Sequence, residues 1–337
     1  MKFGARPVSG AAGAILAHSV MAGKRKLRKG VVLSQEDVQD LQAAQIAEVV
    51  VARLEEGDLH EDAAAALLAR ALVPDAARAR LRITEPFTGR VNLITEGPGV
   101  IALDVAALEA FNRVHPMITI ATVPPFQQMS AGGMVATIKI ISYAVPTSDV
   151  ARASAAAPDA LRLVAPVFPG AGLVVTDIPG APSSDKGIRV IEARLQALGM
   201  TLADVAVVPH NTAALSQALQ TISGEMRLIL TASATSDSYD VAPQAVREAG
   251  GAVHRFGMPV DPGNLLFLGQ IGAHPVIGLP GCARSPALNG ADWVLSRVAC
   301  GIDVTDADIA AMGVGGLLKE IPTRPQPRAG RAGRSAP

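Results

Sequence analysis

Strand-like and helix-like segments alternate between residues 172 and 249, and this alternation restricts the fold more than any other feature of the sequence. Short aliphatic runs predict strands at 172–176, 205–208 and 227–231, and amphipathic segments predict helices at 186–198, 212–222 and 241–249. Strands joined through helices in this order form a parallel sheet with helices on both faces. We therefore predict an α/β domain built on an open, mainly parallel sheet.

The first half of the chain is less regular. Helical patterns are expected near 34–46, 62–72 and 104–114, and the run 134–141 has the composition of a strand. This mixture predicts a smaller mixed α+β domain that precedes the α/β domain.

A small, polar and Ala-rich stretch at 146–158 marks the boundary between the two domains. We therefore expect the first domain over residues 1–155 and the α/β domain over residues 156–321. The tail 322–337 has four arginines and no acidic residue, and we expect it to be disordered.

The charges of the chain balance, with 30 Lys and Arg against 30 Asp and Glu, so no overall field attracts nucleic acid or an anionic membrane. The apolar run 11–21 is too short to cross a bilayer, and the basic cluster 24–29 follows it, unlike the order in a signal peptide. Cys282 and Cys300 are too few for a disulfide framework. We expect a soluble, cytoplasmic protein without nucleic-acid or membrane partners.

Polar loops follow the three predicted strands, at 176–180, 209–211 and 232–240. In an open parallel sheet, ligands lie beyond the carboxyl ends of the strands. Each loop leads into a helix, so backbone N–H groups and positive helix ends face one crevice, which favours a phosphate. The sequence has neither the glycine pattern of a dinucleotide-binding fold nor a phosphate loop ending in Gly-Lys-Ser or Gly-Lys-Thr.

Five short motifs occur in order along this half of the chain: Thr176-Asp177, Val207-Val208-Pro209-His210, the loop 232–240, Pro262-Gly263-Asn264 and Gly278-Leu279-Pro280-Gly281. Their order is similar to that of the molybdopterin-binding domain shared by molybdopterin adenylyltransferases and molybdopterin molybdotransferases. The resemblance covers about residues 161–301. More closely, the chain resembles the molybdopterin-binding half of bacterial proteins in which this region precedes a cytidylyltransferase-like domain.

The resemblance implies that molybdopterin, as ligand or substrate, is bound between these loops. The implied binding residues are Thr176, Asp177, His210, Ser233, Thr235, Ser236, Pro262, Gly263, Asn264, Pro280, Gly281 and Cys282. Asp240 holds the place of a family Asp used in phosphoryl-transfer or metal-assisted chemistry, so the resemblance implies a catalytic role for Asp240 and Mg²⁺ as its metal. It also implies a homo-oligomer, with a separate cytidylyltransferase or a molybdoenzyme as partner.

Three positions depart from the family pattern. Ala232-Ser233 replaces paired glycines, His210 replaces an acidic residue, and Asn264 replaces a lysine. Ligand binding tolerates such changes better than catalysis does. Two functions therefore stay open: an enzyme of molybdenum-cofactor biosynthesis that inserts molybdate or handles a nucleotidyl pterin, and a non-catalytic molybdopterin carrier. A weaker third possibility is another anionic pterin or nucleotide, and Asp240 also fits the N-cap of the helix that begins at Val241.

Overall fold

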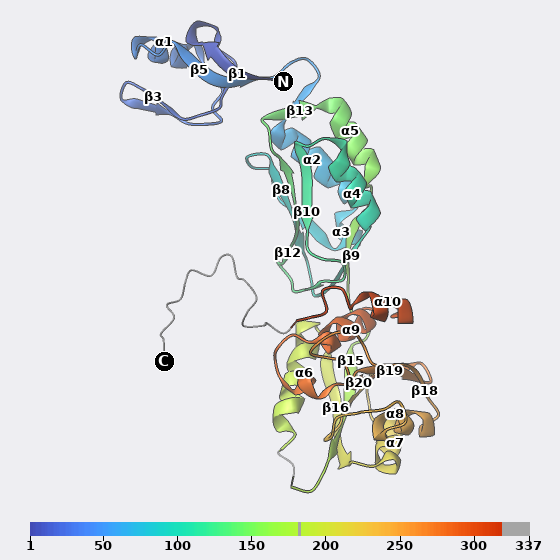
Figure 1. Ribbon diagram of the computed structural model, residues 1–337. Helices are drawn as coiled ribbons and strands as arrows, with labels where there is room; N and C mark the ends of the chain where they lie inside the picture. Colours follow the sequence, from blue (N-terminus) through green and yellow to red (C-terminus); the bar gives the residue numbers. More distant parts are fainter. Residues whose placement is uncertain (181–182, 319–337) are drawn as a thin grey trace. The chain divides into compact units, whose positions relative to one another are not determined.

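The computed structural model describes residues 1–180 and 183–318 (Figure 1). The chain divides into two compact units, Met1–Ala165 and Pro166–Pro337. The tail 322–337, expected to be disordered, lies outside the described residues. In the described part of the chain, no helix is both long enough and apolar enough to cross a bilayer.

The first unit opens with a small β-rich region. Its elements are β1 (Lys2–Pro7), the 3-10 helix η1 (Val8–Gly10), β2 (Ile15–Leu16), β3 (Val20–Ala22), β4 (Arg25–Leu27), α1 (Gln35–Ala43) and β5 (Glu48–Arg53). β5 lies between β1 and β2 in an antiparallel sheet, and β3 pairs with β4. α1 begins with a capping box between Ser34 and Asp37, as a Ser followed by acidic residues predicts.

The rest of the first unit combines a four-stranded and a three-stranded antiparallel sheet with helices. Its elements are β6 (Asp58–His60), α2 (Glu61–Leu72), α3 (Ala76–Ala79), β7 (Leu81–Ile83), β8 (Arg90–Thr95), β9 (Gly99–Leu103), α4 (Val105–Val114), β10 (Ile118–Thr122), β11 (Gln128–Met129), β12 (Met134–Ile140), β13 (Ala144–Pro146), α5 (Thr147–Ala156) and β14 (Leu161–Val164). The strand orders are β10-β12-β8-β7 and β11-β9-β14, and β13 pairs with β6.

Helices α2, α4 and α5 gather on one side of the four-stranded sheet (Figure 1), where Leu68, Phe111 and Ile138 share one core. The predicted mixed α+β character of this half is confirmed. β14 lies beyond residue 155, after which the boundary was expected, and it belongs to the first unit because it pairs with β9.

The second unit is built on a six-stranded sheet with the order β16-β15-β17-β20-β19-β18. The strands are β15 (Gly170–Asp177), β16 (Thr201–Pro209), β17 (Met226–Leu230), β18 (Ala252–Phe256), β19 (Phe267–Ile271) and β20 (His274–Leu279). β15 runs parallel to β16 and β17, and β17 runs parallel to β20, whereas β19 is antiparallel to both of its neighbours. The predicted open, mainly parallel sheet is therefore confirmed.

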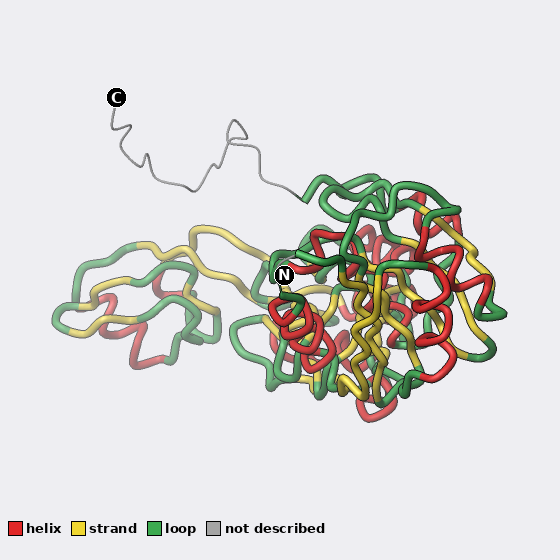
Figure 2. Tube along the Cα trace, turned by 90° about the horizontal axis from the view of Figure 1, so that it is seen from below, coloured by secondary structure: helices red, strands yellow, loops and turns green. Residues whose placement is uncertain are grey.

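Helices cover both faces of this sheet, as predicted. One face carries α6 (Asp185–Ala197), α9 (Gly290–Ala299) and α10 (Asp306–Ala311), and the other carries α7 (Thr212–Thr221) and α8 (Val241–Glu248). The side chains of β17 alternate between the two cores: Leu228 and Leu230 face α6 and α9, and Ile229 faces α7 and α8. Figure 2 shows the strands as a layer between helices. Because β15, β17 and β20 are parallel neighbours, their carboxyl ends share one edge of the sheet.

Candidate functional site

A cavity of about 420 Å³ lies where β15, β17 and β20 end. From the predicted binding residues, Thr176, Asp177, Gly281 and Cys282 line it. The other lining residues are Ser183, Ser184, Lys186, Gly187, Ala232, Arg284 and Ser285. They come from the start of α6, the loop after β17, and the 3-10 helix η2 (Gly281–Arg284) with the residue after it. The predicted crevice at the carboxyl ends of the strands is thus present as a hollow.

Thr176 connects the ends of three neighbouring strands. Its side chain is almost completely buried, at 1% exposed. The hydroxyl oxygen accepts a hydrogen bond from the Ala232 N–H at 2.9 Å and lies 2.8 Å from Nδ1 of His210. The His210 N–H in turn donates to the Asp177 carbonyl at 2.9 Å. Thr176 and His210 therefore form the frame of the site, with His210 behind the lining.

Two positively charged side chains, those of Arg284 and Lys186, line the cavity. Arg284 donates from Nη2 to the Thr231 carbonyl at 2.8 Å, and burial lowers the pKa of its guanidinium. A guanidinium has five N–H donors, and among the described residues the Arg284 side chain makes this one hydrogen bond. Lys186, in the first turn of α6, adds a second positive charge, and Asp177 is the acidic group on the lining. A half-buried guanidinium with unused donors favours an anionic ligand.

Gly187 makes room for Arg284 against α6. A Cβ at this position would lie 3.0 Å from Cδ2 of Leu230 and 3.1 Å from Nη1 of Arg284. The missing side chain therefore leaves room for the guanidinium beside α6.

The loop 232–240 is held mainly by its own hydrogen bonds. The Asp240 carboxylate accepts from the Val241 N–H at 2.7 Å and from the Ser236 N–H at 2.9 Å, so it caps α8. The buried Thr235 lies beside Thr231, whose hydroxyl donates to the Ser233 carbonyl at 2.6 Å. Asp240, Ser233, Thr235 and Ser236 do not line the cavity.

Comparison with known protein families gives two matches. Residues 174–297 match the family described as a probable molybdopterin binding domain, and residues 5–53 match a domain of unknown function. No curated protein matches the chain.

Two solved structures resemble the chain distantly. The molybdopterin biosynthesis MoeA protein from Pyrococcus horikosii is 13% identical with a TM-score of 0.32, and the match covers 89% of this chain and 75% of that one. A molybdenum cofactor biosynthesis protein from Pyrococcus furiosus is 11% identical with a TM-score of 0.24, over 92% of this chain and 65% of that one.

The Pro262-Gly263-Asn264 turn of the molybdopterin-binding domain precedes β19 and lies on the start of α9. The Pro262 carbonyl accepts from the Gly290 N–H at 2.8 Å, and a Cβ on Gly263 would lie 2.7 Å from that nitrogen. The Asn264 carbonyl accepts from the Met258 N–H at 3.0 Å. The turn does not line the cavity, and neither does Pro280, whose carbonyl accepts from the Ala283 N–H at 2.9 Å as η2 begins. Close backbone packing accounts for Gly263, whereas a Cβ on Gly281 would meet nothing within 4 Å.

A second hollow of about 640 Å³ lies on β18, β19 and the segment before α10. It is larger than the first, but it contains none of the predicted binding residues. Its arginine, Arg255, already donates to the Gly257 carbonyl at 3.0 Å and lies 3.5 Å from Asp306. The smaller cavity, with the uncommitted donors of Arg284, is therefore the better candidate for an anion site.

The cations of the cavity had weak sequence signals. Lys186 follows Asp185 at the start of a predicted helix, and Arg284 follows Pro280-Gly281 after a predicted turn. Either residue alone is typical of a solvated surface. Their meeting in one wall depends on Gly187 and on the sheet order, which places β17 between β15 and β20.

Residues 1–180 and 183–318 contain no group of three His, Cys, Asp or Glu side chains that could hold a metal ion. Asp240, the expected Mg²⁺ ligand, caps α8 with one carboxylate oxygen and accepts from the Ser236 N–H of the loop with the other. Its surroundings do not form a metal site from protein donors alone.

Proposed function

We propose that the domain around residues 174–297 holds molybdopterin in the 420 Å³ cavity and that the protein serves molybdenum-cofactor biosynthesis. The volume falls within the range of about 300–1,000 Å³ that is usual for small-molecule sites. The observation that carries the proposal is the Arg284 guanidinium, which is partly desolvated, lines the cavity and has donors that no described residue engages.

The ligand's two ends fit different parts of the cavity. The phosphate of molybdopterin lies against Arg284 and Lys186, near the N-terminal end of α6, where the helix dipole also favours negative charge. Charge-assisted N–H···O⁻ bonds from the guanidinium fork fix its orientation. The Asp177 carboxylate offers an acceptor to the N–H groups of the pterin ring. The Thr176 hydroxyl accepts the Ala232 N–H and so holds Ala232 in the cavity lining.

A non-catalytic carrier is the second candidate function, and the geometry of Asp240 favours it. This carboxylate is committed to the cap of α8 and lies outside the cavity lining. A carrier would hold molybdopterin for a separate cytidylyltransferase or deliver it to a molybdoenzyme. The enzyme candidate requires Asp240 to reach the reacting groups.

The test of the proposed function is an anaerobic titration of the full chain with molybdopterin, followed by intrinsic ligand fluorescence. We expect saturable binding by the wild-type protein and a loss of about tenfold or more in affinity for Arg284→Ala, because a charge-assisted hydrogen bond contributes about 1.5–3 kcal/mol. Arg189→Ala, which removes a charge from an exposed position of α6, is the matched control and keeps wild-type affinity. Wild-type protein that binds no molybdopterin, or equal affinities for Arg284→Ala and wild type, would refute the proposal.

A further inference from the structure

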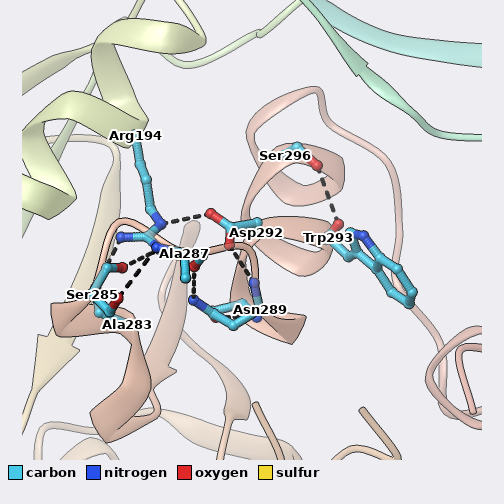
Figure 3. A network of polar contacts seen from close by, with 9 residues as sticks. Arg194, Ala283, Ser285, Ala287, Asn289, Asp292, Trp293 and Ser296 are labelled. Atoms are coloured by element: carbon cyan, nitrogen blue, oxygen red, sulfur yellow. Dashed lines mark hydrogen bonds and ion pairs between the residues drawn. The ribbon is translucent and has the colours of Figure 1, made fainter. Parts of the chain in front are cut away.

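Arg194 of α6 ties this helix to the chain segment that carries Arg284 (Figure 3). Its side chain is 11% exposed, and Nε donates to the Asp292 carboxylate at 2.6 Å. Nη1 donates to the Ala283 carbonyl at 2.9 Å, and Nη2 donates to the carbonyls of Ser285 at 2.8 Å and Ala287 at 3.2 Å. All three guanidinium nitrogens are therefore engaged, and three of the four acceptors are backbone carbonyls of the segment 283–287.

The acidic partner of Arg194 is itself fixed by the start of α9. The Asp292 carboxylate also accepts from the Asn289 N–H at 2.8 Å, as part of the capping box of that helix. Asn289 is buried and donates from its side chain to the Ala287 carbonyl at 3.1 Å. The Ala287 carbonyl thus receives hydrogen bonds from two side chains, and the network joins α6, the segment 283–287 and α9.

The segment 283–287 needs such support. Its first two residues end the short helix η2, and Ser285 and Ala287 beyond them have exposed side chains that anchor nothing in the core. The carbonyls of Ala283, Ser285 and Ala287 find their partners in the Arg194 and Asn289 side chains instead of in a helix or sheet ladder. Arg284 and Ser285, which line the cavity, lie within this segment.

We infer that Arg194 is a positioning residue of the molybdopterin site, an inference that rests on the proposed function. Arg194 does not line the cavity. It holds the backbone on both sides of Arg284, so that the guanidinium of Arg284 meets the anion in one orientation. The planar fork of an arginine can address a carboxylate and three carbonyls at fixed angles, which a lysine cannot do. Arg194→Lys therefore keeps the charge and loses the geometry.

A double-mutant cycle in binding separates positioning from general stabilisation. We expect Arg194→Lys to weaken molybdopterin affinity of the full chain about tenfold, because it acts through one charge-assisted contact. In the Arg284→Ala background, Arg194→Lys should cause no further loss. Arg189→Ala, on the exposed side of the same helix, keeps wild-type affinity. Circular dichroism melting of each variant records the loss of stability separately.

The inference is overturned if Arg194→Lys binds like the wild type, or if its loss adds fully to that of Arg284→Ala. A lower melting temperature with unchanged affinity overturns it as well, because that result leaves Arg194 a structural role alone. If Arg194→Lys does not fold, Asp292→Asn, which disturbs the network from the α9 side, undergoes the same cycle with the same outcomes. Absence of wild-type binding, or no effect of Arg284→Ala, would instead refute the proposed function.

Discussion

The hydroxyl oxygen of Thr176 lies 2.8 Å from Nδ1 of His210, at the point where β15 and β16 both end. The same oxygen accepts the Ala232 N–H, which follows β17. One buried hydroxyl therefore holds together three neighbouring strand ends, of which those of β15 and β17 border the cavity. The hydrogen on this bond is carried either by the hydroxyl or by the imidazole, according to the tautomer of His210.

Thr176→Val should weaken molybdopterin affinity and lower the free energy of unfolding by about 1–3 kcal/mol, because it leaves the Ala232 N–H without its acceptor. Thr176→Ser is the matched variant: it keeps the hydroxyl and loses one buried methyl group. Urea denaturation measures stability, and molybdopterin titration measures affinity. We expect Ser to retain wild-type affinity and Val to lose it. Equal affinities for Val and Ser would show that the hydroxyl does not shape the lining.

Gly187→Ala should reduce molybdopterin affinity with little loss of stability. The new methyl group would lie about 3.1 Å from Nη1 of Arg284, so the guanidinium must move. In a helix, replacing Gly by Ala gains about 1 kcal/mol of propensity, which offsets the crowding against Leu230. Melting temperature and molybdopterin affinity, measured on the same sample, would show whether affinity falls while stability is kept. A variant that binds as tightly as the wild type would argue against Arg284 as the anion ligand.

The architecture of the second unit was accessible from the sequence because its aliphatic runs and amphipathic segments alternate. Strand limits were less accessible. β16 begins at Thr201 instead of 205, since it pairs with β15 from Gly170 onward even though Thr201 and Asp204 interrupt the aliphatic run. A short aliphatic run also does not show whether its strand runs parallel or antiparallel to its neighbours. The antiparallel direction of β19 is therefore known only from its pairing with β18 and β20.

The candidate site was accessible only in outline. Loops at strand ends indicated where the cavity lies, and Thr176 and Gly281 line it. The positive charge of the cavity could not be predicted from the sequence, because it depends on a contact between distant segments. Arg284 reaches the Thr231 carbonyl across the space left by Gly187, and no local pattern encodes that meeting.

Glu61→Gln should remove a pH-dependent loss of stability in the first unit. Burial raises the pKa of the Glu61 carboxyl, and Lys139 opposes this only in part. The folded chain therefore keeps this proton to a higher pH than the unfolded chain does, so the stability that it contributes is present below the unfolded pKa and is lost as pH rises through the folded pKa. Urea denaturation across this range should show a decline for the wild type that is smaller in Glu61→Gln. Glu85→Gln, at an exposed position, is the charge control, and an unchanged decline in Glu61→Gln would contradict the assignment.

Asp240 separates the carrier from the enzyme. Asp240→Ala removes the cap of α8 and should lower the free energy of unfolding by about 1 kcal/mol, whereas Asp240→Asn keeps a side-chain acceptor and most of that stability. Neither variant should change molybdopterin affinity, because Asp240 does not line the cavity. Each protein is then incubated with molybdopterin, molybdate, Mg²⁺ and nucleotide, and the products are identified by mass spectrometry. A carrier returns unchanged molybdopterin in every case. Conversion by the wild type that stops in the stable Asp240→Asn variant would establish the enzyme and place Asp240 at the reacting groups.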